Sequence, residues 1–331
     1  MNKEVILLGY TSPAHTNWFP WNRFKQAFDE LGKENRWTEL SNFKRESGKS
    51  YIFVCWNMPD VLDLISLGLL TKEDIVLQKV TSMTKRESSA NWGNDPNQFY
   101  STWNWPAYQM CLDVINQGYN LYAFGCKTDI SLHPVKQDIV NKLDKRFIPI
   151  PWSTCMYSDQ ELQKQTVLSD NFEYDACFVG SIWGVKGRGN LESVRDYLMP
   201  VLNSTNEVYI GGSGTPRGRV SNSDHVAAIK KSKLCPIVNA PSWRAERGVQ
   251  DRFWTVFASG RFGISDTEGV YDFFDESEVV CEVDPGEYIE KSLYFMKNID
   301  KQIPYIEKIQ NRIKQEYNWT RNFEKIFEVI R

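Results

Sequence analysis

Residues 176–188 read Ala-Cys-Phe-Val-Gly-Ser-Ile-Trp-Gly-Val-Lys-Gly-Arg, a short apolar run followed by a glycine-serine pair and two cations. The apolar run predicts a buried β-strand, and the residues after it predict a loop that leads into a helix. Gly180 and Ser181 allow a ligand to approach the backbone closely, while Lys186 and Arg188 add positive charge. This combination suits a diphosphate, although an ordinary strand-to-helix turn has the same composition.

Strand-like and helix-like segments alternate on both sides of this stretch. Short apolar runs at 5–8, 51–55 and 75–80 are separated by longer amphipathic segments, and a similar series follows residue 176. This alternation is typical of parallel sheets covered by helices, so we expect an α/β fold. Ligands of such sheets bind at the carboxyl ends of the strands.

The series is interrupted once, near the middle of the chain. Pro149 and Pro151 break the pattern, and residues 159–170 are polar and resemble a linker. We therefore expect two Rossmann-like domains, residues 1–160 and residues 161–331, with the site in the cleft between them.

Composition excludes several classes of protein. The chain has 331 residues, of which 41% are hydrophobic and 24% charged, so it is neither disordered nor of low complexity. No apolar run reaches the roughly 18 residues that a membrane-spanning helix needs, and the start, MNKEVILLGY, does not read as a signal peptide. The seven cysteines include no C-x-x-C pair, which argues against a zinc site or a disulfide framework. These features predict a cytoplasmic protein.

Charge is distributed unevenly. Residues 1–160 carry 17 basic and 17 acidic side chains and are neutral. Residues 184–261 carry 12 basic and 6 acidic side chains, a net charge of +6, whereas residues 262–290 carry ten acidic and no basic ones. A short basic region in a chain of net charge -3 predicts a small anionic ligand rather than a long polyanion. A solvated charged face is the alternative.

Two further loops of the second half share this chemistry. Residues 209–219 follow a predicted strand and contain Gly211, Gly212 and Arg217. Residues 241–254 lead into a predicted helix whose free N–H groups could face phosphate, and they contain Arg247, Gly248, Val249, Asp251 and Arg252. Because all three segments follow strands of one predicted sheet, their ligand-facing ends should converge.

Candidate catalytic groups lie in the first half. His15 stands in the loop after the first predicted strand, where it could hold a phosphate or act as an acid or base. Asp129 and Glu87 also follow strand-like runs and are rival bases. For His133 and His225 we prefer a structural role.

Tryptophan is unusually abundant, with 12 residues in the chain, seven of them before residue 106. Several of these stand beside amide side chains in loop-like sequence. Flat apolar faces beside amides suit sugar rings or stacked bases, so we expect an acceptor-binding surface, although core packing accounts for many of these residues. The candidates for this surface are Trp18, Trp92, Trp103 and Trp105.

The stretch 252–260, Arg-Phe-Trp-Thr-Val-Phe-Ala-Ser-Gly, followed by Gly-Ile-Ser-Asp at 263–266, resembles the donor-binding signature of GT-B glycosyltransferases. It is most similar to the group-1, CgeB-like branch. Phage DNA glucosyltransferases share this architecture, and their strand, Gly-Ser and basic segment is similar to residues 179–188. The resemblance is strongest over residues 175–325.

This resemblance implies a nucleoside diphosphate sugar, with a UDP-sugar favoured, and no obligatory metal or cofactor. It also implies C-terminal helices that pack back toward the N-terminal domain. Gly180, Ser181 and Arg188 would approach the diphosphate, Gly211 and Gly212 the nucleotide, and Arg252 the phosphates. The family's ribose-binding glutamate falls at Thr255, and Asp251 or Glu268 could take its place.

The expected activity is therefore transfer of a sugar to an acceptor hydroxyl. A glycan or glycoconjugate acceptor fits the neutral, tryptophan-rich first half. DNA with a hydroxylated base is the alternative acceptor, and it would require phosphate contacts that a neutral domain does not favour. A nucleotide-sugar-binding module without activity is a third reading, which Thr255 keeps open.

Overall fold

The structure is a computed structural model of the whole chain. It describes residues 3–9, 11–12, 18–56, 58–79, 105–125, 142–185, 188–241, 244 and 247–330. The chain forms two compact units, which we call unit 1 and unit 2. Unit 1 comprises Met1–Pro151 and Trp319–Arg331, and unit 2 comprises Trp152–Asn318. The assignment of an acceptor side to residues 1–160 and of a donor side to residues 161–331 stays a prediction.

Unit 1 is built on a six-stranded, wholly parallel sheet in the order β2-β1-β3-β4-β5-β6. Every residue of the central strands β3 and β4 is buried, as in sheets covered on both faces. The strands are β1 (Glu4–Leu8), β2 (Asn35–Thr38), β3 (Tyr51–Cys55), β4 (Ile75–Lys79), β5 (Asn120–Gly125) and β6 (Phe147–Pro149).

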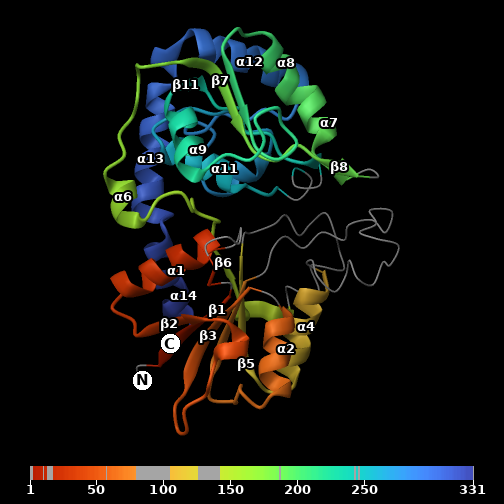
Figure 1. Cartoon of the computed structure of the whole chain (residues 1–331), viewed down its shortest axis with the longest axis vertical. Coiled ribbons are helices and arrows are strands. Elements are labelled where there is room, and N and C mark those ends of the chain that lie inside the picture. Colours follow the sequence, from red (N-terminus) through yellow and green to blue (C-terminus); the bar gives the residue numbers. More distant parts are fainter. Residues whose placement is uncertain are drawn as a thin grey trace. The chain divides into compact units, whose positions relative to one another are not determined.

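Helices cover both faces of this sheet, with α1 and α14 on one face and α2 and α4 on the other (Figure 1). Their bounds are α1 (Trp18–Glu30), α2 (Met58–Ser66), α4 (Trp105–Asn116) and α14 (Trp319–Val329), with short 3₁₀ turns at Leu40–Asn42 and Asp144–Arg146. Helix α14 is the end of the chain and packs on α1, where the ring of Phe323 lies 4.3 Å from that of Phe28 and 5.0 Å from that of Phe24. The predicted return of the C-terminal helices to the N-terminal domain is thus confirmed by α14.

Unit 2 contains a second parallel sheet, in the order β10-β7-β11. The strands are β7 (Tyr174–Val179), β10 (Val208–Gly211) and β11 (Ser232–Leu234). Extended backbone at residues 237, 265 and 281 continues the parallel arrangement, through single bridges from Ile237 to Ser265 and from Ser265 to Cys281. The mixed α/β fold with parallel sheets is therefore confirmed in both units.

One local prediction in unit 2 is wrong. The loop after β7 does not lead directly into a helix, because an antiparallel hairpin of β8 (Gly184–Val185) and β9 (Arg188–Gly189) intervenes. Asn190 closes this hairpin: its backbone N donates to the carbonyl of Trp183 (2.9 Å), and its Nδ2 donates to the carbonyl of Ser181 (2.8 Å). Arg188 thus belongs to a strand and not to the start of a helix.

The helices of unit 2 surround its sheet. They are α6 (Asp159–Gln163), α7 (Leu191–Ser193), the π-helical turn η4 (Val194–Leu198), α8 (Met199–Asn203), α9 (Asn222–Lys230), α11 (Asp251–Ala258), α12 (Pro285–Lys297) and α13 (Ile303–Glu316), with 3₁₀ turns at Glu268–Asp272 and Ile299–Lys301. Helix α6 lies within the polar stretch predicted as a linker, where a capping box between Ser158 and Glu161 starts it. In the described part of the chain, no helix has the length and apolar character needed to cross a membrane.

The packing of α14 gives a test of the fold. Phe323 is completely buried between α1 and α14. Replacing it with alanine leaves a cavity, so Phe323→Ala should lower the free energy of unfolding by about 3–5 kcal/mol. Urea denaturation measures the loss. Val329→Ala is the control, because Val329 is 44% exposed on the same helix. Equal, small effects of the two substitutions would contradict this packing.

Candidate functional site

The loops that follow β7 and β10 lie against each other at the carboxyl ends of these strands. The backbone N of Gly180 donates to the carbonyl of Gly211 (2.9 Å), and that of Ile182 donates to the carbonyl of Ser213 (2.8 Å). Gly212 has a positive φ of 126°, and a Cβ on it would lie only 2.1 Å from the carbonyl oxygen of Gly180. The structure therefore brings Gly180, Gly211 and Gly212 together as one backbone surface, without side chains.

Arg252, in the first turn of α11, is fixed at the same strand ends. Its Nε donates to the carbonyl of Val179 (3.1 Å) and its Nη1 to the carbonyl of Val238 (3.0 Å), while the guanidinium lies 4.2 Å from the ring centroid of Phe178. Nη2 faces Gly180, where an added Cβ would be 2.0 Å away. Burial lowers the pKa of this arginine, but its ordinary value is high enough for it to stay charged. A cation of fixed orientation thus lies beside the backbone of Gly180, which has no side chain.

Asp266, the last residue of the Gly-Ile-Ser-Asp stretch, had no predicted contact of its own and lies at this end of the sheet. Asp266 is completely buried and accepts hydrogen bonds from the backbone N of Asn239 (2.8 Å) and from Nη1 of Arg244 (3.3 Å). Burial raises the pKa of Asp266 to about 6. Its position two residues after the apolar run 262–264 was the signal that could have found it. Asp266 orients Arg244 and lies close enough to Arg252 to favour its charged form.

Helix α11 carries a polar stripe that binds the first residues of unit 2. We call residues 152–157 the strap. The backbone N of Cys155 donates to Oδ1 of Asp251 (3.1 Å), the hydroxyls of Thr154 and Thr255 lie 2.8 Å apart, and those of Tyr157 and Ser259 lie 2.7 Å apart. The three helix positions are 251, 255 and 259, each one turn apart and hence on one face.

The contacts with the strap occupy polar groups of α11 that could otherwise bind a ligand. Thr255 is completely buried, and its hydroxyl also donates to Oδ2 of Asp251 (3.3 Å). Thr255 is thus a structural residue here, and its predicted correspondence to a ribose-binding glutamate stays a prediction. Asp251 already accepts two hydrogen bonds, and burial raises the pKa of Asp251 to about 6. A role of Asp251 at the ribose stays a prediction.

The predicted residues before α11 are Arg247, Gly248 and Val249. Arg247 has a positive φ of 53° and pairs with Oε2 of Glu268 (3.1 Å) and Oδ1 of Asp272 (3.2 Å). Its charge is balanced by these two carboxylates. Gly248 and Val249 are buried. The structure therefore places these three residues close to Arg252 in sequence, but it gives them internal contacts.

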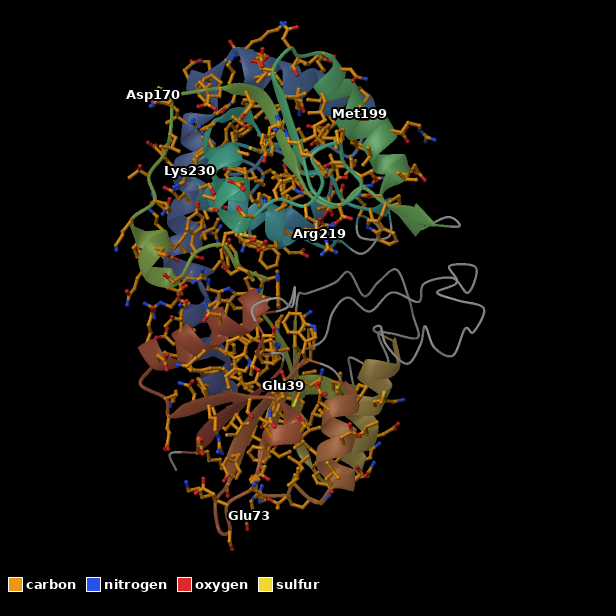
Figure 2. The ribbon with its side chains drawn as sticks, in the orientation of Figure 1. Glu39, Glu73, Asp170, Met199, Arg219 and Lys230 are labelled. Atoms are coloured by element: carbon orange, nitrogen blue, oxygen red, sulfur yellow. The ribbon has the colours of Figure 1, made fainter. Side chains whose placement is uncertain are left out.

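The loop between β10 and α9 carries two exposed cations. The guanidinium of Arg217 lies 4.6 Å from the ring centroid of Tyr209, and the loop is closed by a hydrogen bond from the backbone N of Gly212 to the carbonyl of Gly218 (2.7 Å). Figure 2 shows Arg219 at the end of unit 2 where β8 and α11 lie. Ser181, whose carbonyl accepts from Asn190, is exposed in the neighbouring loop.

His225 is the one histidine that the structure describes. Burial, with a smaller contribution from Arg252, lowers the pKa of His225 to about 4, so the ring is neutral at physiological pH. Its Nε2 is buried without a hydrogen-bond partner. These surroundings fit the structural role that the sequence analysis preferred.

Several predicted residues fall outside the described residues. These are His15, Asp129, Glu87, His133, Lys186, Trp92 and Trp103. Trp18 and Trp105 begin α1 and α4, and Arg188 lies in β9, but the side chains of these three are not described. Their predicted roles stay predictions.

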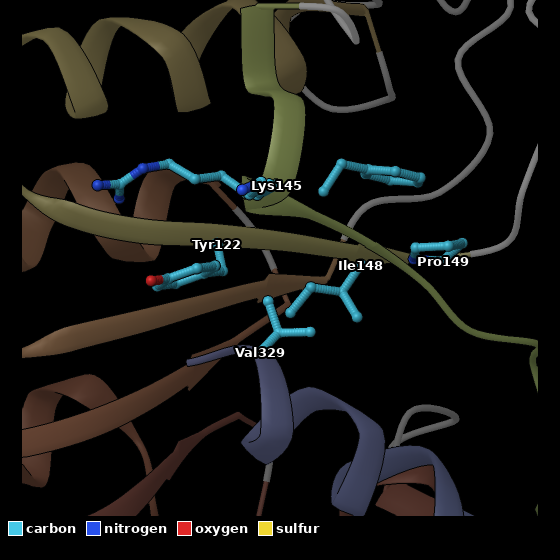
Figure 3. A pocket seen from close by; sticks show the side chains of 7 residues that line it. Tyr122, Lys145, Ile148, Pro149 and Val329 are labelled. Carbon is cyan, nitrogen blue, oxygen red and sulfur yellow. The ribbon is translucent and has the colours of Figure 1, made fainter. Parts of the chain in front are cut away.

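A pocket of about 540 Å³ lies elsewhere, beside the edge strand β6 of unit 1 (Figure 3). Nη1 of Arg146 donates to Oδ1 of Asn120 (3.1 Å), and its guanidinium lies 5.3 Å from the ring centroid of Tyr122. The pocket contains none of the predicted site residues. Its lining consists of Tyr122, Lys145, Arg146, Phe147, Ile148, Pro149 and Val329.

The chain is similar to a known protein family and to several solved structures. Residues 192–328 match a family model described as glycosyl transferase-like. No curated protein sequence matches the chain. This match covers part of unit 2 and all but the end of the last helix.

Solved structures match over nearly the whole chain. T4 phage β-glucosyltransferase with its UDP-glucose substrate has 11% identity and a TM-score of 0.61, covering 98% of this chain and 99% of that one. A point mutant of TarM from S. aureus, in complex with fondaparinux, α-GlcNAc-glycerol and UDP, has 11% identity and a TM-score of 0.54, covering 85% and 55%. An α-glucosyltransferase with UDP and a 13-mer DNA has 10% identity, a TM-score of 0.53 and coverage of 99% and 98%. The chain therefore has the GT-B glycosyltransferase fold.

The strap contacts predict an effect of pH on stability. Because burial raises the pKa of Asp251 to about 6, the folded protein holds a proton at pH 5 that the unfolded chain releases. Asp251 thus lowers stability as the pH rises from about 4 to 6, and this loss persists at pH 7. An asparagine still accepts from Cys155 without carrying charge, so Asp251→Asn should raise Tm at pH 7 and flatten its pH dependence below 6.

Asp175→Asn is the control for this prediction. Its partner Lys233 lies 2.7 Å away and lowers the pKa of Asp175, so losing this carboxylate should lower Tm at pH 7. Thermal unfolding between pH 4 and 8 measures both variants. A lower Tm of Asp251→Asn at pH 7 would show that the buried charge stabilises the strap.

Proposed function

We propose that this protein is a glycosyltransferase that moves a sugar from a nucleoside diphosphate sugar, with a UDP-sugar favoured, to an acceptor hydroxyl. The observation that carries this proposal is Arg252. Its guanidinium is held by the carbonyls of Val179 and Val238 beside Gly180, at strand ends where α/β sheets bind ligands. The glycosyltransferase-like family match and the GT-B fold support the same activity.

The proposed chemistry needs stabilisation of a leaving diphosphate. The acceptor oxygen forms a bond to the anomeric carbon of the sugar, and the bond from that carbon to the β-phosphate oxygen breaks. The negative charge that develops on the diphosphate would be stabilised by Arg252 and Arg217, and by Lys186 and Arg188 of the hairpin. These cations supply the charge that a metal ion supplies in other enzymes, and we propose that no metal is required.

The other donor contacts follow from the backbone surface. Gly180, Ser181, Gly211 and Gly212 would let the diphosphate and the nucleotide approach the main chain. The ribose would be bound by Asp251 or Glu268. Each of these carboxylates would then give up or share an existing partner, Cys155 for Asp251 and Arg247 for Glu268.

The fate of the acceptor proton depends on the stereochemistry. If the reaction inverts the anomeric centre, His15 or Asp129 would accept the proton from the acceptor hydroxyl. If the reaction retains the configuration, the departing β-phosphate oxygen would accept this proton, and no protein base is required.

For the acceptor we propose a glycan or glycoconjugate, bound with the help of Trp18, Trp92, Trp103 and Trp105. The neutral charge of residues 1–160 supports this choice. Membership of the CgeB-like branch and a cytoplasmic location belong to the same proposal.

DNA is the second candidate acceptor, and one observation favours it. A DNA-modifying β-glucosyltransferase matches end to end, with coverage of 99% of both chains, whereas only 55% of TarM is covered. The two acceptors can be separated by transfer of label from UDP-glucose to neutral oligosaccharides or to duplex DNA with hydroxymethylated bases. Transfer to DNA that falls steeply with added salt would favour the second candidate.

Thermal shift with UDP-, GDP- and dTDP-sugars tests the donor, followed by hydrolysis of any sugar that binds. A UDP-sugar should raise Tm, because a ligand that binds only the folded state stabilises it. If no nucleotide sugar raises Tm, the donor site is wrong. A sugar that binds and is neither transferred nor hydrolysed would indicate an inactive binding module.

The role of Arg252 can be tested by substitution. Arg252→Ala removes a charge-assisted contact of about 1.5–3 kcal/mol, so the Kd for UDP should rise roughly 10- to 150-fold. Calorimetric titration measures this change. Arg195→Ala is the control, because it removes the same charge from the basic region at a site where the arginine only pairs with Asp196 on the surface. Equal affinities of the two variants would remove Arg252 from the site.

A further inference from the structure

Unit 1 contains a second group of polar side chains at the carboxyl ends of its strands. Leu8, Cys55 and Gln78 are partners in the parallel register of β1, β3 and β4. The residues that follow them, Gly9, Trp56 and Lys79, therefore form the last row of these three strands. This is the edge of a parallel sheet at which ligands bind.

Gly9 allows Trp21 of α1 to lie directly on this row. A Cβ on Gly9 would be 2.1 Å from Nε1 of Trp21, so any other residue would displace the indole. Trp21 is 1% exposed, and its Nε1 has no hydrogen-bond partner. A buried N–H donor without a partner costs free energy, which a ligand oxygen could recover.

On the opposite side of Trp56, the side-chain oxygen of Gln78 is a buried acceptor that also lacks a hydrogen-bond partner. Nε2 of Gln78 donates to the carbonyls of Trp56 (3.0 Å) and Lys79 (2.7 Å), which fixes the amide. Oε1 of Gln78 is buried and has no partner. The row thus presents one unpartnered donor and one unpartnered acceptor, on either side of a half-buried indole.

The aromatic faces in this group are already covered. Nζ of Lys79 lies 4.2 Å from the ring centroid of Trp56, and the ring of Phe24 stacks at 6.4 Å. The ring of Trp21 lies 5.8 Å from that of Trp56. A nucleobase is bound by stacking on an open aromatic face, whereas a hydroxyl needs a donor and an acceptor. These groups suit a sugar better than a base.

An unpartnered indole N–H is not in itself a site, as Trp254 of unit 2 shows. Its Nε1 also has no partner and is completely buried. The rings around it are those of Phe253, Phe273 and Tyr317, at 5.3–5.6 Å. Trp21 differs because it lies at the sheet edge beside a second unpartnered polar group and a cation.

We propose that Trp21 and Gln78 bind two hydroxyl groups of a neutral sugar unit of the acceptor, at the carboxyl edge of the sheet of unit 1. The indole Nε1 donates to one hydroxyl oxygen of this sugar unit, and Oε1 of Gln78 accepts the proton of another hydroxyl. Gly9 is the positioning residue that lets Trp21 reach the strand ends. This inference rests on the proposed function and specifies the acceptor side of it.

The substitution Trp21→Phe removes the N–H and keeps an aromatic ring. The affinity for neutral oligosaccharides should fall about tenfold, the value of one hydrogen bond of about 1.4 kcal/mol. Trp254→Phe is the matched control, because it removes an equally unpartnered N–H with the same loss of volume. It should leave the affinity for oligosaccharides unchanged.

Indole NMR identifies the contact directly. In protein labelled with ¹⁵N-tryptophan, the signal missing from Trp21→Phe belongs to Trp21. Maltotriose, cellotriose and chitotriose at millimolar concentration are the probes, and at least one should shift this signal and leave that of Trp254 in place. If no sugar shifts it, or if only duplex DNA with hydroxymethylated bases does, the inference is wrong.

Binding of UDP separates this result from the proposed function. The wild-type chain and Trp21→Phe should bind UDP equally, since Trp21 lies in unit 1. A protein that binds UDP but shows no sugar-dependent shift of Trp21 overturns the inference alone. A protein that binds no nucleotide sugar overturns the proposed function itself.

Discussion

The candidate site depends on the guanidinium of Arg252, which two carbonyls hold at the ends of neighbouring strands. The contact exists only because residue 180 is a glycine, since a Cβ would overlap Nη2 at 2.0 Å. Gly212 is required for a related reason, because its Cβ would overlap the carbonyl of Gly180. Gly180 therefore leaves room for the guanidinium of Arg252, and Gly212 leaves room for the backbone of Gly180 beside it.

Helix α11 links this cation to the strap. Arg252, in the first turn of this helix, donates a hydrogen bond to the carbonyl of Val179. On another side, Asp251, Thr255 and Ser259 bind residues 152–157. A shift of the strap would therefore move α11 and with it Arg252, the residue proposed to bind the phosphates. This arrangement also gives Thr255 a structural partner, Thr154.

Much of the fold could be predicted from the sequence because it follows from burial. The central strands β3 and β4 are continuous apolar runs, which mark a sheet covered on both faces. The convergence of the glycine loops followed from their places after strands of one sheet. The hairpin of β8 and β9 could not be predicted, since it depends on the bonds of Asn190 and on the positive φ of Gly189, and neither has a periodic signal.

The site was predicted less completely, because side-chain partners distant in sequence decide it. Arg247 was expected at the phosphates, but Glu268 and Asp272, more than twenty residues away, bind it. Asp266 was missed because a single acid after a strand is a weak signal. The pairing of Trp21 with Gly9 depends on the packing of α1 on β1, which no local pattern specifies.

The most direct measurement of the central claim is a crystal structure of the chain with UDP bound. We expect a phosphate oxygen at about 2.7–2.9 Å from Nη2 of Arg252, the usual length of a charge-assisted hydrogen bond, with the diphosphate against Gly180 and Gly212. A diphosphate bound elsewhere on the chain, with Arg252 still held only by Val179 and Val238, would contradict it.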